Sequence, residues 1–174
     1  MRARPHGGAR MVTVAPIELA SDPREMSSAC FEKALDLLSR RPHFRRELER
    51  KLSTRGFPSD EVNEALERAS ELGYLDDLEC ARGLARVRVT RKNEGPARLY
   101  ATLTRRGSDS ETARRVADEL YAEGEGEVIG RAAAKWLASH EWDFDRLARH
   151  LTNRGFSSGA VLEVLDDTRP RRAE

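Results

Sequence analysis

The sequence predicts an all-α protein made of three tandem three-helix repeats that form an elongated, curved array. Two observations predict this fold: a short motif recurs three times, and apolar residues align when the chain is shifted by the spacing of that motif. The composition agrees, because only 39% of the 174 residues are hydrophobic and 35% are charged. A core built from so few apolar side chains must be thin, which suits stacked small units better than one deep globule.

The repeated motif is Leu-Ser/Thr-x-Arg-Gly, which occurs at residues 52–56, 103–107 and 151–155. The distance is 51 residues from Gly56 to Gly107 and 48 residues from Gly107 to Gly155. The same two shifts align apolar residues in columns, which are spaced as on the buried faces of three helices per repeat. The columns are Cys30/Ala81/Ile129, Ala34/Ala85/Ala133, Leu38/Val89/Leu137, Leu48/Leu99/Leu147, Leu52/Leu103/Leu151, Val62/Ala113/Val161, Ala65/Val116/Val164 and Leu66/Ala117/Leu165.

Capping residues stand where the helices of each repeat are expected to begin. Asp76 is predicted to cap the first helix of the second repeat, with Glu79 three residues later as in a capping box. Pro42 and Pro96 are expected at the first position of the second helices, where the missing N–H has no cost. The candidate caps of the third helices are Ser59, Ser108 or Asp109, and Ser157 or Ser158.

Glycines mark the expected helix ends. Gly56, Gly107 and Gly155 should end the second helices in the left-handed conformation. Gly73 and Gly124 should end the third helices of the first two repeats. The boundaries that follow are a flexible extension at 1–26, repeats at 27–73, 74–124 and 125–169, and a tail at 170–174.

The sequence contains no pattern typical of an active site. His6, His43, His140 and His150 are scattered, and none shares a convincing helix face with a second metal-binding side chain four residues away. Asp76 and Asp77 are adjacent and should point in different directions, so helix capping explains them better than acid–base chemistry. We therefore expect a protein that is not an enzyme and that has no metal site and no cofactor.

The cysteines, tryptophans and apolar segments also favour structural roles. Cys30 falls in a core column and should be a small buried hydrophobe, and Cys80 lies one position off that column. Trp136 and Trp142 are interpreted as packing groups rather than as a base-stacking platform. No segment reaches the roughly 20 apolar residues of a membrane span. We expect a cytoplasmic protein that does not bind membranes.

Positive charge is concentrated in two segments, although the net charge of the chain is only +1. The segment from Arg40 to Arg55 has seven basic and two acidic residues, and the segment from Arg86 to Arg106 has seven basic and one acidic residue. Because the two segments occupy similar positions in successive repeats, they predict a basic stripe that binds a polyanion. The candidate contact residues are Arg45, Arg46, Arg50, Arg86, Arg88, Arg91, Lys92, Arg98, Arg105 and Arg106.

These motifs together resemble the RecX family of regulatory proteins. The resemblance rests on the Arg-Gly-Phe turns within 52–57 and 151–156, on Gly-Tyr-Leu-Asp-Asp at 73–77, on the first helix at 34–40 and on the basic segment that leads to Gly95. It covers about residues 29–167.

The resemblance implies a modulator of the RecA recombinase. Such a protein would lie in the groove of the RecA–DNA filament and inhibit ATP hydrolysis, strand exchange and co-protease activity. The implied partners are the RecA filament and the single-stranded or duplex DNA within it, and we expect the modulator to be a monomer.

Two other functions remain open. The tight turns before the third helices could form helix-turn-helix units that read duplex DNA directly, which would give a sequence-selective footprint without RecA. The repeats could instead form a scaffold that binds only proteins, in which case affinity for nucleoprotein would not depend on salt.

Overall fold

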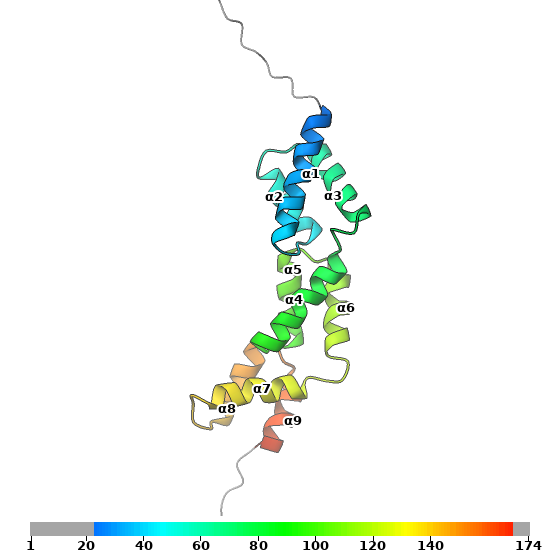
Figure 1. Ribbon diagram of the computed structural model, residues 1–174. Helices are drawn as coiled ribbons and strands as arrows, with labels where there is room; N and C mark the ends of the chain where they lie inside the picture. Colours follow the sequence, from blue (N-terminus) through cyan, green and yellow to red (C-terminus); the bar gives the residue numbers. More distant parts are fainter. Residues whose placement is uncertain (1–22, 169–174) are drawn as a thin grey trace, which may run out of the picture.

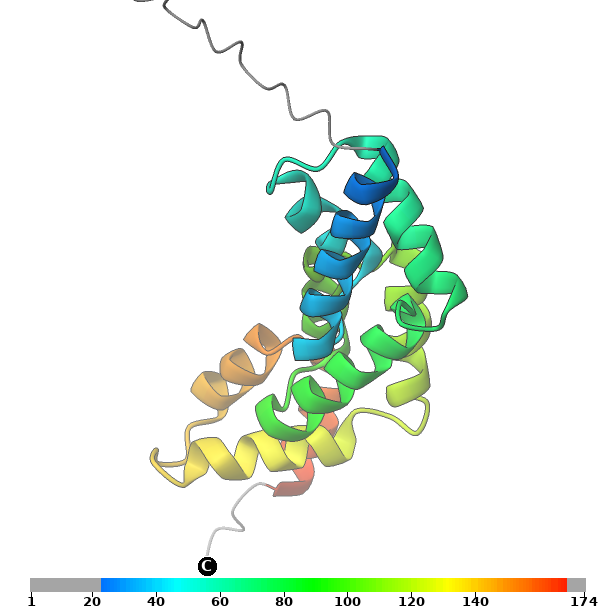
Figure 2. The ribbon, with the colours of Figure 1, turned by 45° about the horizontal axis from the view of Figure 1, so that its top comes forward.

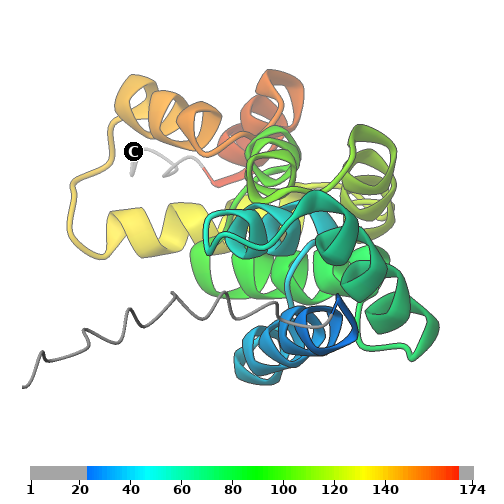
Figure 3. The same cartoon turned by 90° about the horizontal axis from the view of Figure 1, so that it is seen from above.

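The computed structural model describes residues 23–168, which form nine α-helices and no strand. The helices are stacked as an elongated, bent array (Figures 1 and 2). Viewed along the long axis, the three repeats overlap (Figure 3). Repeat 1 contains α1 (Pro23–Arg40), α2 (Arg45–Ser53) and α3 (Ser59–Glu71); repeat 2 contains α4 (Asp77–Lys92), α5 (Pro96–Arg106) and α6 (Ser110–Leu120); repeat 3 contains α7 (Gly126–Leu137), α8 (Phe144–Asn153) and α9 (Ser158–Thr168).

The apolar columns expected from the sequence form the core. Of these residues only Leu38, Leu137 and Val164 are half-buried, and all the others are buried. Leu37 is buried in place of its neighbour Leu38. The prediction of three tandem three-helix repeats is confirmed.

The buried side chains gather in two clusters. One lies within repeat 1, and the other runs continuously through repeats 2 and 3. Phe44, which directly precedes α2 of repeat 1, is fully buried in the second cluster. Repeats 2 and 3 therefore share one core, whereas repeat 1 has its own core and is joined to the rest through Phe44.

Most of the predicted helix ends are found. Gly56, Gly73, Gly107, Gly124 and Gly155 all have φ between 74° and 116°, so each has the left-handed conformation that favours glycine. Three aspartates cap helices by accepting a hydrogen bond from the backbone N–H three residues later: Asp76 for α4, Asp109 for α6 and Asp143 for α8.

Three sequence-based expectations about helix starts are wrong. The first helix begins at Pro23, inside the segment 1–26 that was expected to be a flexible extension. Pro42 does not begin α2, which starts at Arg45, because the buried Phe44 fixes the entry of the chain. Ser59 is the first residue of α3 and not its cap, which is Pro58 without a side-chain hydrogen bond. Residues 1–22 of the expected extension and the expected tail 170–174 lie outside the described residues.

Nothing in residues 23–168 suits a membrane crossing, because no helix there has both the length and the apolar character that a span requires.

Candidate functional site

The Arg-Gly turn at the end of one second helix packs on the start of the second helix in the preceding repeat. Gly107 follows α5 and lies against the first turn of α2, and Gly155 follows α8 and lies against the first turn of α5. The helices α2, α5 and α8 therefore follow one another end to end along the array (Figure 1). This column of second helices contains six of the ten predicted cations, on α2 and α5.

Side chains build the first junction, between repeats 1 and 2. A Cβ atom at Gly107 would lie 3.2 Å from Phe44 Cβ and 3.3 Å from Glu47 N, so a larger residue there would press on the start of α2. Arg106, which precedes this glycine, forms an ion pair with the buried Glu47 (Nη2 to Oε2, 3.4 Å). The turn of repeat 2 is thus held by one apolar contact and one buried charge pair.

The Glu47 carboxylate is surrounded by cations. Lys51 Nζ lies 3.2 Å from Oε1, and Arg41 donates hydrogen bonds to both oxygens. Burial acts to raise the pKa of Glu47, but hydrogen bonds from Arg41 and Lys51 and the charge of Arg106 outweigh burial and bring the pKa to about 2. Burial lowers the pKa of the neighbouring His43, so its neutral ring can donate from Nδ1 to the Arg41 carbonyl and accept from Lys51 at Nε2. These cations stabilise the junction.

Backbone groups build the second junction, between repeats 2 and 3. The Gly95 N–H donates to the Arg154 carbonyl (2.8 Å), and the Ala97 N–H donates to the Gly155 carbonyl (3.1 Å). A Cβ atom at Gly95 would lie 2.4 Å from the Gly155 carbonyl carbon, and one at Gly155 would lie 2.4 Å from Arg98 N. Only glycine at both positions permits this approach of the two backbones.

A second buried glutamate, Glu94, lies beside this junction. Its carboxylate pairs with Arg88 Nη2 (2.6 Å) and with Arg98 Nε (3.6 Å), and it accepts a hydrogen bond from Thr102 Oγ1 (3.3 Å). The Arg98 side chain is still 53% exposed and also donates to the Asn153 carbonyl of α8 (3.2 Å). Arg88 is therefore held by the fold, whereas Arg98 belongs to both the junction and the surface.

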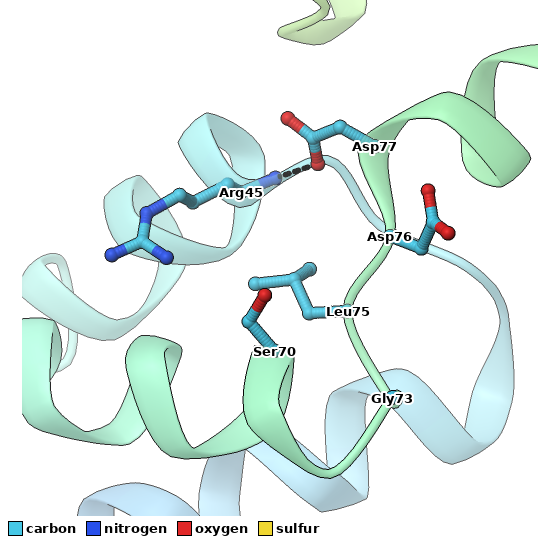
Figure 4. A pocket seen from close by; sticks show the side chains of 6 residues that line it. All are labelled: Arg45, Ser70, Gly73, Leu75, Asp76 and Asp77. Atoms are coloured by element: carbon cyan, nitrogen blue, oxygen red, sulfur yellow. Dashed lines mark hydrogen bonds between the residues drawn. The ribbon is translucent and has the colours of Figure 1, made fainter.

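The adjacent acids Asp76 and Asp77 cap two different helices. Asp76 caps its own helix, since its Oδ1 accepts from Glu79 N (2.9 Å). Asp77 accepts instead from the backbone N–H of Arg45 (2.7 Å), at the start of α2, which has no cap of its own. Figure 4 shows the two carboxylates pointing apart at the rim of a hollow of about 440 Å³ between repeats 1 and 2. Capping accounts for both acids, as expected from the sequence.

The ten predicted cations fall into three groups. Arg46, Arg50, Arg86, Arg91, Lys92 and Arg105 are exposed and form no ion pair within residues 23–168. Arg45 is half-buried. Arg88, Arg98 and Arg106 form ion pairs with the two buried glutamates, so they take part in the fold.

The other side chains that could support chemistry are buried or isolated. Cys30 and Cys80 are both buried free thiols, and burial raises the pKa of each to about 11, so neither is a reactive thiolate. Across the described part of the chain, no three side chains of the kinds that ligate metals come together. His140 stacks on Trp136 with ring centroids 4.3 Å apart.

Comparison with known proteins identifies the family. The family model described as "RecX, first three-helix domain" matches residues 30–68. The protein named Regulatory protein RecX from Thermus thermophilus is 36% identical over 139 residues, which cover 80% of this chain and 92% of that protein. The protein of the same name from Prosthecochloris aestuarii is 30% identical over 138 residues, covering 78% and 90%. The chain belongs to the RecX family.

Solved RecX structures have the same fold. The crystal structure of RecX from Lactobacillus salivarius superposes with a TM-score of 0.74 at 23% identity, covering 83% of this chain and 97% of that one. A second RecX crystal structure gives a TM-score of 0.71 at 20% identity, with 82% and 73% covered. The relatives are named regulatory proteins, which agrees with the binding function expected from the sequence.

In this RecX-family chain the column of second helices includes two cations that the sequence analysis missed. Arg146 and Arg149 are exposed on α8. A shift of 48 residues takes Arg98 to Arg146, and both shifts together take Arg50 to Arg149. A search for basic runs passes over them because acids flank them along the chain, including the helix cap Asp143. The repeat register was the signal that could have found them.

Proposed function

We propose that this chain is a non-enzymatic regulator that binds in the groove of the RecA–DNA filament and inhibits ATP hydrolysis, strand exchange and co-protease activity. It acts as a cytoplasmic monomer that contacts both RecA and the DNA within the filament. Membership of the RecX family and the all-helical, elongated array support the proposal.

The observation that carries the proposal is the end-to-end column of second helices with its exposed cations. On α2 the column presents Arg46 and Arg50, one helical turn apart, and on α5 it presents Arg98 and Arg105, two turns apart. Arg91 lies in the last turn of α4. An elongated surface with cations at intervals suits a helical groove that is lined by phosphates and acidic side chains.

The contact should come from exposed cations, and Arg88 and Arg106 are poor candidates for it. Arg88 and Arg106 each supply one of the cationic partners of the buried Glu94 and Glu47, so replacing either would remove part of the compensation of a buried charge and would destabilise the fold. Arg91 and Arg105 are exposed and form no ion pair within residues 23–168. They are therefore the better positions for a functional test.

The test measures RecA ATPase activity on single-stranded DNA, titrated with wild type and with the double variant Arg91→Glu/Arg105→Glu at two salt concentrations. Wild type should inhibit, and its affinity should fall as salt rises because counterions compete for the charged contact. The double variant should bind the filament markedly more weakly. It should keep its fold, since exposed substitutions usually change stability by only about 0.5 kcal/mol.

A matched control is Arg114→Glu/Lys135→Glu, which makes the same change of net charge at two exposed positions, on α6 and α7, that form no ion pair within residues 23–168. This control should inhibit like wild type. Equal inhibition by all three proteins would contradict the proposal that the exposed cations bind the filament. No inhibition by any of them would contradict RecA as the partner. A sequence-selective footprint on duplex DNA without RecA would favour direct DNA reading instead.

A further inference from the structure

Repeat 3 contains a hollow beside α8, the last helix in the column of second helices. It has a volume of about 260 Å³ and is lined by Trp136 at the end of α7 and by Arg146, Arg149, His150 and Asn153 along α8. The four α8 residues are spaced i, i+3, i+4 and i+7, so they share the face of α8 opposite the buried Leu147 and Leu151.

Aromatic rings form one wall of this hollow. The Trp136 indole is half-buried and packs against the core shared by repeats 2 and 3, which fixes its position. His140 stacks on it with an interplanar angle of 8°, and the His150 ring lies 6.2 Å away, tilted by 39°. His140 Nδ1 is itself within hydrogen-bond distance of the Trp136 carbonyl (2.9 Å). His140 therefore covers one face of the indole, and the part of the ring that lines the hollow is left for a ligand.

The cations of the hollow have no acidic partner. Arg146 and Arg149 are exposed and form no ion pair within residues 23–168. By contrast, Arg82 and Arg115 on repeat 2 are held by Glu119, and Arg131 on α7 is held by Glu127. Two unneutralised guanidinium groups beside a fixed indole match a ligand that combines a negative charge with a flat ring.

We propose that this hollow binds a nucleotide of single-stranded nucleic acid, with the base against the Trp136 ring and the flanking phosphates on Arg146 and Arg149. Pockets that enclose a drug-sized molecule usually measure about 300–1,000 Å³, so this smaller hollow suits a single base. Bases in a duplex are already stacked on their neighbours, so only an unpaired base offers a free face.

Repeat 2 contacts one end of the hollow, because Arg98 donates to the carbonyl of Asn153, which lines it. The inference rests on the proposed function for the source of the strand, which is the DNA inside the RecA filament. It can nevertheless be tested with DNA alone, so its failure would leave the inhibition of RecA untouched.

The experiment uses the fluorescence of Trp136 in a Trp142→Phe background, since the chain has only these two tryptophans. Titration with a short oligothymidylate should quench the emission and reach saturation. The double change Arg146→Gln/Arg149→Gln should weaken binding by roughly tenfold or more. It should also flatten the slope of log affinity against log salt by about 1.4, since each phosphate contact on a single strand contributes about 0.7.

Two comparisons separate this site from general attraction to charge. Arg55→Gln/Arg114→Gln makes the same change of net charge at exposed arginines of repeats 1 and 2 that form no ion pair within residues 23–168, and it should leave the titration unchanged. An abasic oligonucleotide of equal length should bind roughly tenfold more weakly, because it lacks the stacking base. The proposal would be overturned if the two oligonucleotides bound equally well, or if the control variant lost as much affinity as Arg146→Gln/Arg149→Gln. It would also be overturned if an acidic peptide quenched the emission and oligothymidylate did not.

Discussion

Three single substitutions of glycine by alanine should separate two costs: that of a left-handed backbone and that of steric contact between the backbones at the second junction. Gly56 and Gly155 both stand in an Arg-Gly-Phe sequence and have nearly the same φ, 90° and 91°. A Cβ atom at Gly56 would meet nothing within 4 Å, whereas one at Gly155 would lie 2.4 Å from Arg98 N. Gly95 has an ordinary φ of −75°, but a Cβ atom there would lie 2.4 Å from the Gly155 carbonyl carbon.

The expected magnitudes follow from these geometries. Gly56→Ala should cost about 1–2 kcal/mol of stability, the cost of a left-handed L-residue. Gly95→Ala should cost about 2–4 kcal/mol, because the junction must open and lose its hydrogen bonds, each worth about 0.5–1.5 kcal/mol. Gly155→Ala combines both effects and should cost about 3–6 kcal/mol.

The assay is urea unfolding followed by helical circular dichroism, with the free energy of unfolding extrapolated to water for each variant. Stability should fall in the order wild type, Gly56→Ala, Gly95→Ala and Gly155→Ala. Equal losses for Gly56→Ala and Gly155→Ala would show that only φ matters and that the backbone junction contributes nothing.

Two further predictions concern capping and charge. Asp76→Ala should lower the free energy of unfolding in urea by about 1 kcal/mol, and Asp76→Asn should restore most of that loss. Asp77→Ala should destabilise by a similar amount, because α2 loses its cap. An Asp76→Asn variant that loses function at full stability would contradict the capping role. The pKa of Glu47 is held at about 2, below its usual 4.5, so its contribution is present above about pH 4.5 and is lost as pH falls toward 2. The difference in stability between wild type and Glu47→Gln, roughly 3 kcal/mol at neutral pH, should therefore shrink over that range, and a constant difference would exclude this ionisation.

The parts of this structure that the sequence could predict are those set by periodicity within one repeat. Columns such as Leu48/Leu99/Leu147 are predictable because each member lies on the buried face of the same helix in its own repeat. The role of Asp77 was less accessible, because its partner Arg45 is 32 residues away and belongs to another repeat. Contacts across a junction depend on how the repeats dock, and a repeat alignment does not contain that information.

The dependence on how the repeats dock also explains why the buried partners of the candidate cations could not be predicted. Glu47 stands where the aligned repeats have Arg98 and Arg146, so the alignment gave no hint that this acid would be buried and would bind Arg106. The hollow beside Trp136 lies between the last turn of α7 and one face of α8, and a repeat alignment does not show how these two helices pack. Counting charges along the chain found the basic segments but could not tell free cations from neutralised ones.

The junction between repeats 1 and 2 and the junction between repeats 2 and 3 are held by different kinds of contact, so we expect them to differ in stiffness. Repeats 2 and 3 share a core and are stitched by backbone hydrogen bonds between Gly95 and Arg154 and between Ala97 and Gly155, which break if the units tilt. Repeat 1 is held by the Phe44 ring, by the ion pair between Glu47 and Arg106 and by the hydrogen bond from the Arg45 N–H to Asp77, and side chains can follow a small rotation without losing contact. We expect repeats 2 and 3 to move as one stiff body with repeat 1 as a jointed arm, which would let the protein adapt to a groove whose pitch varies.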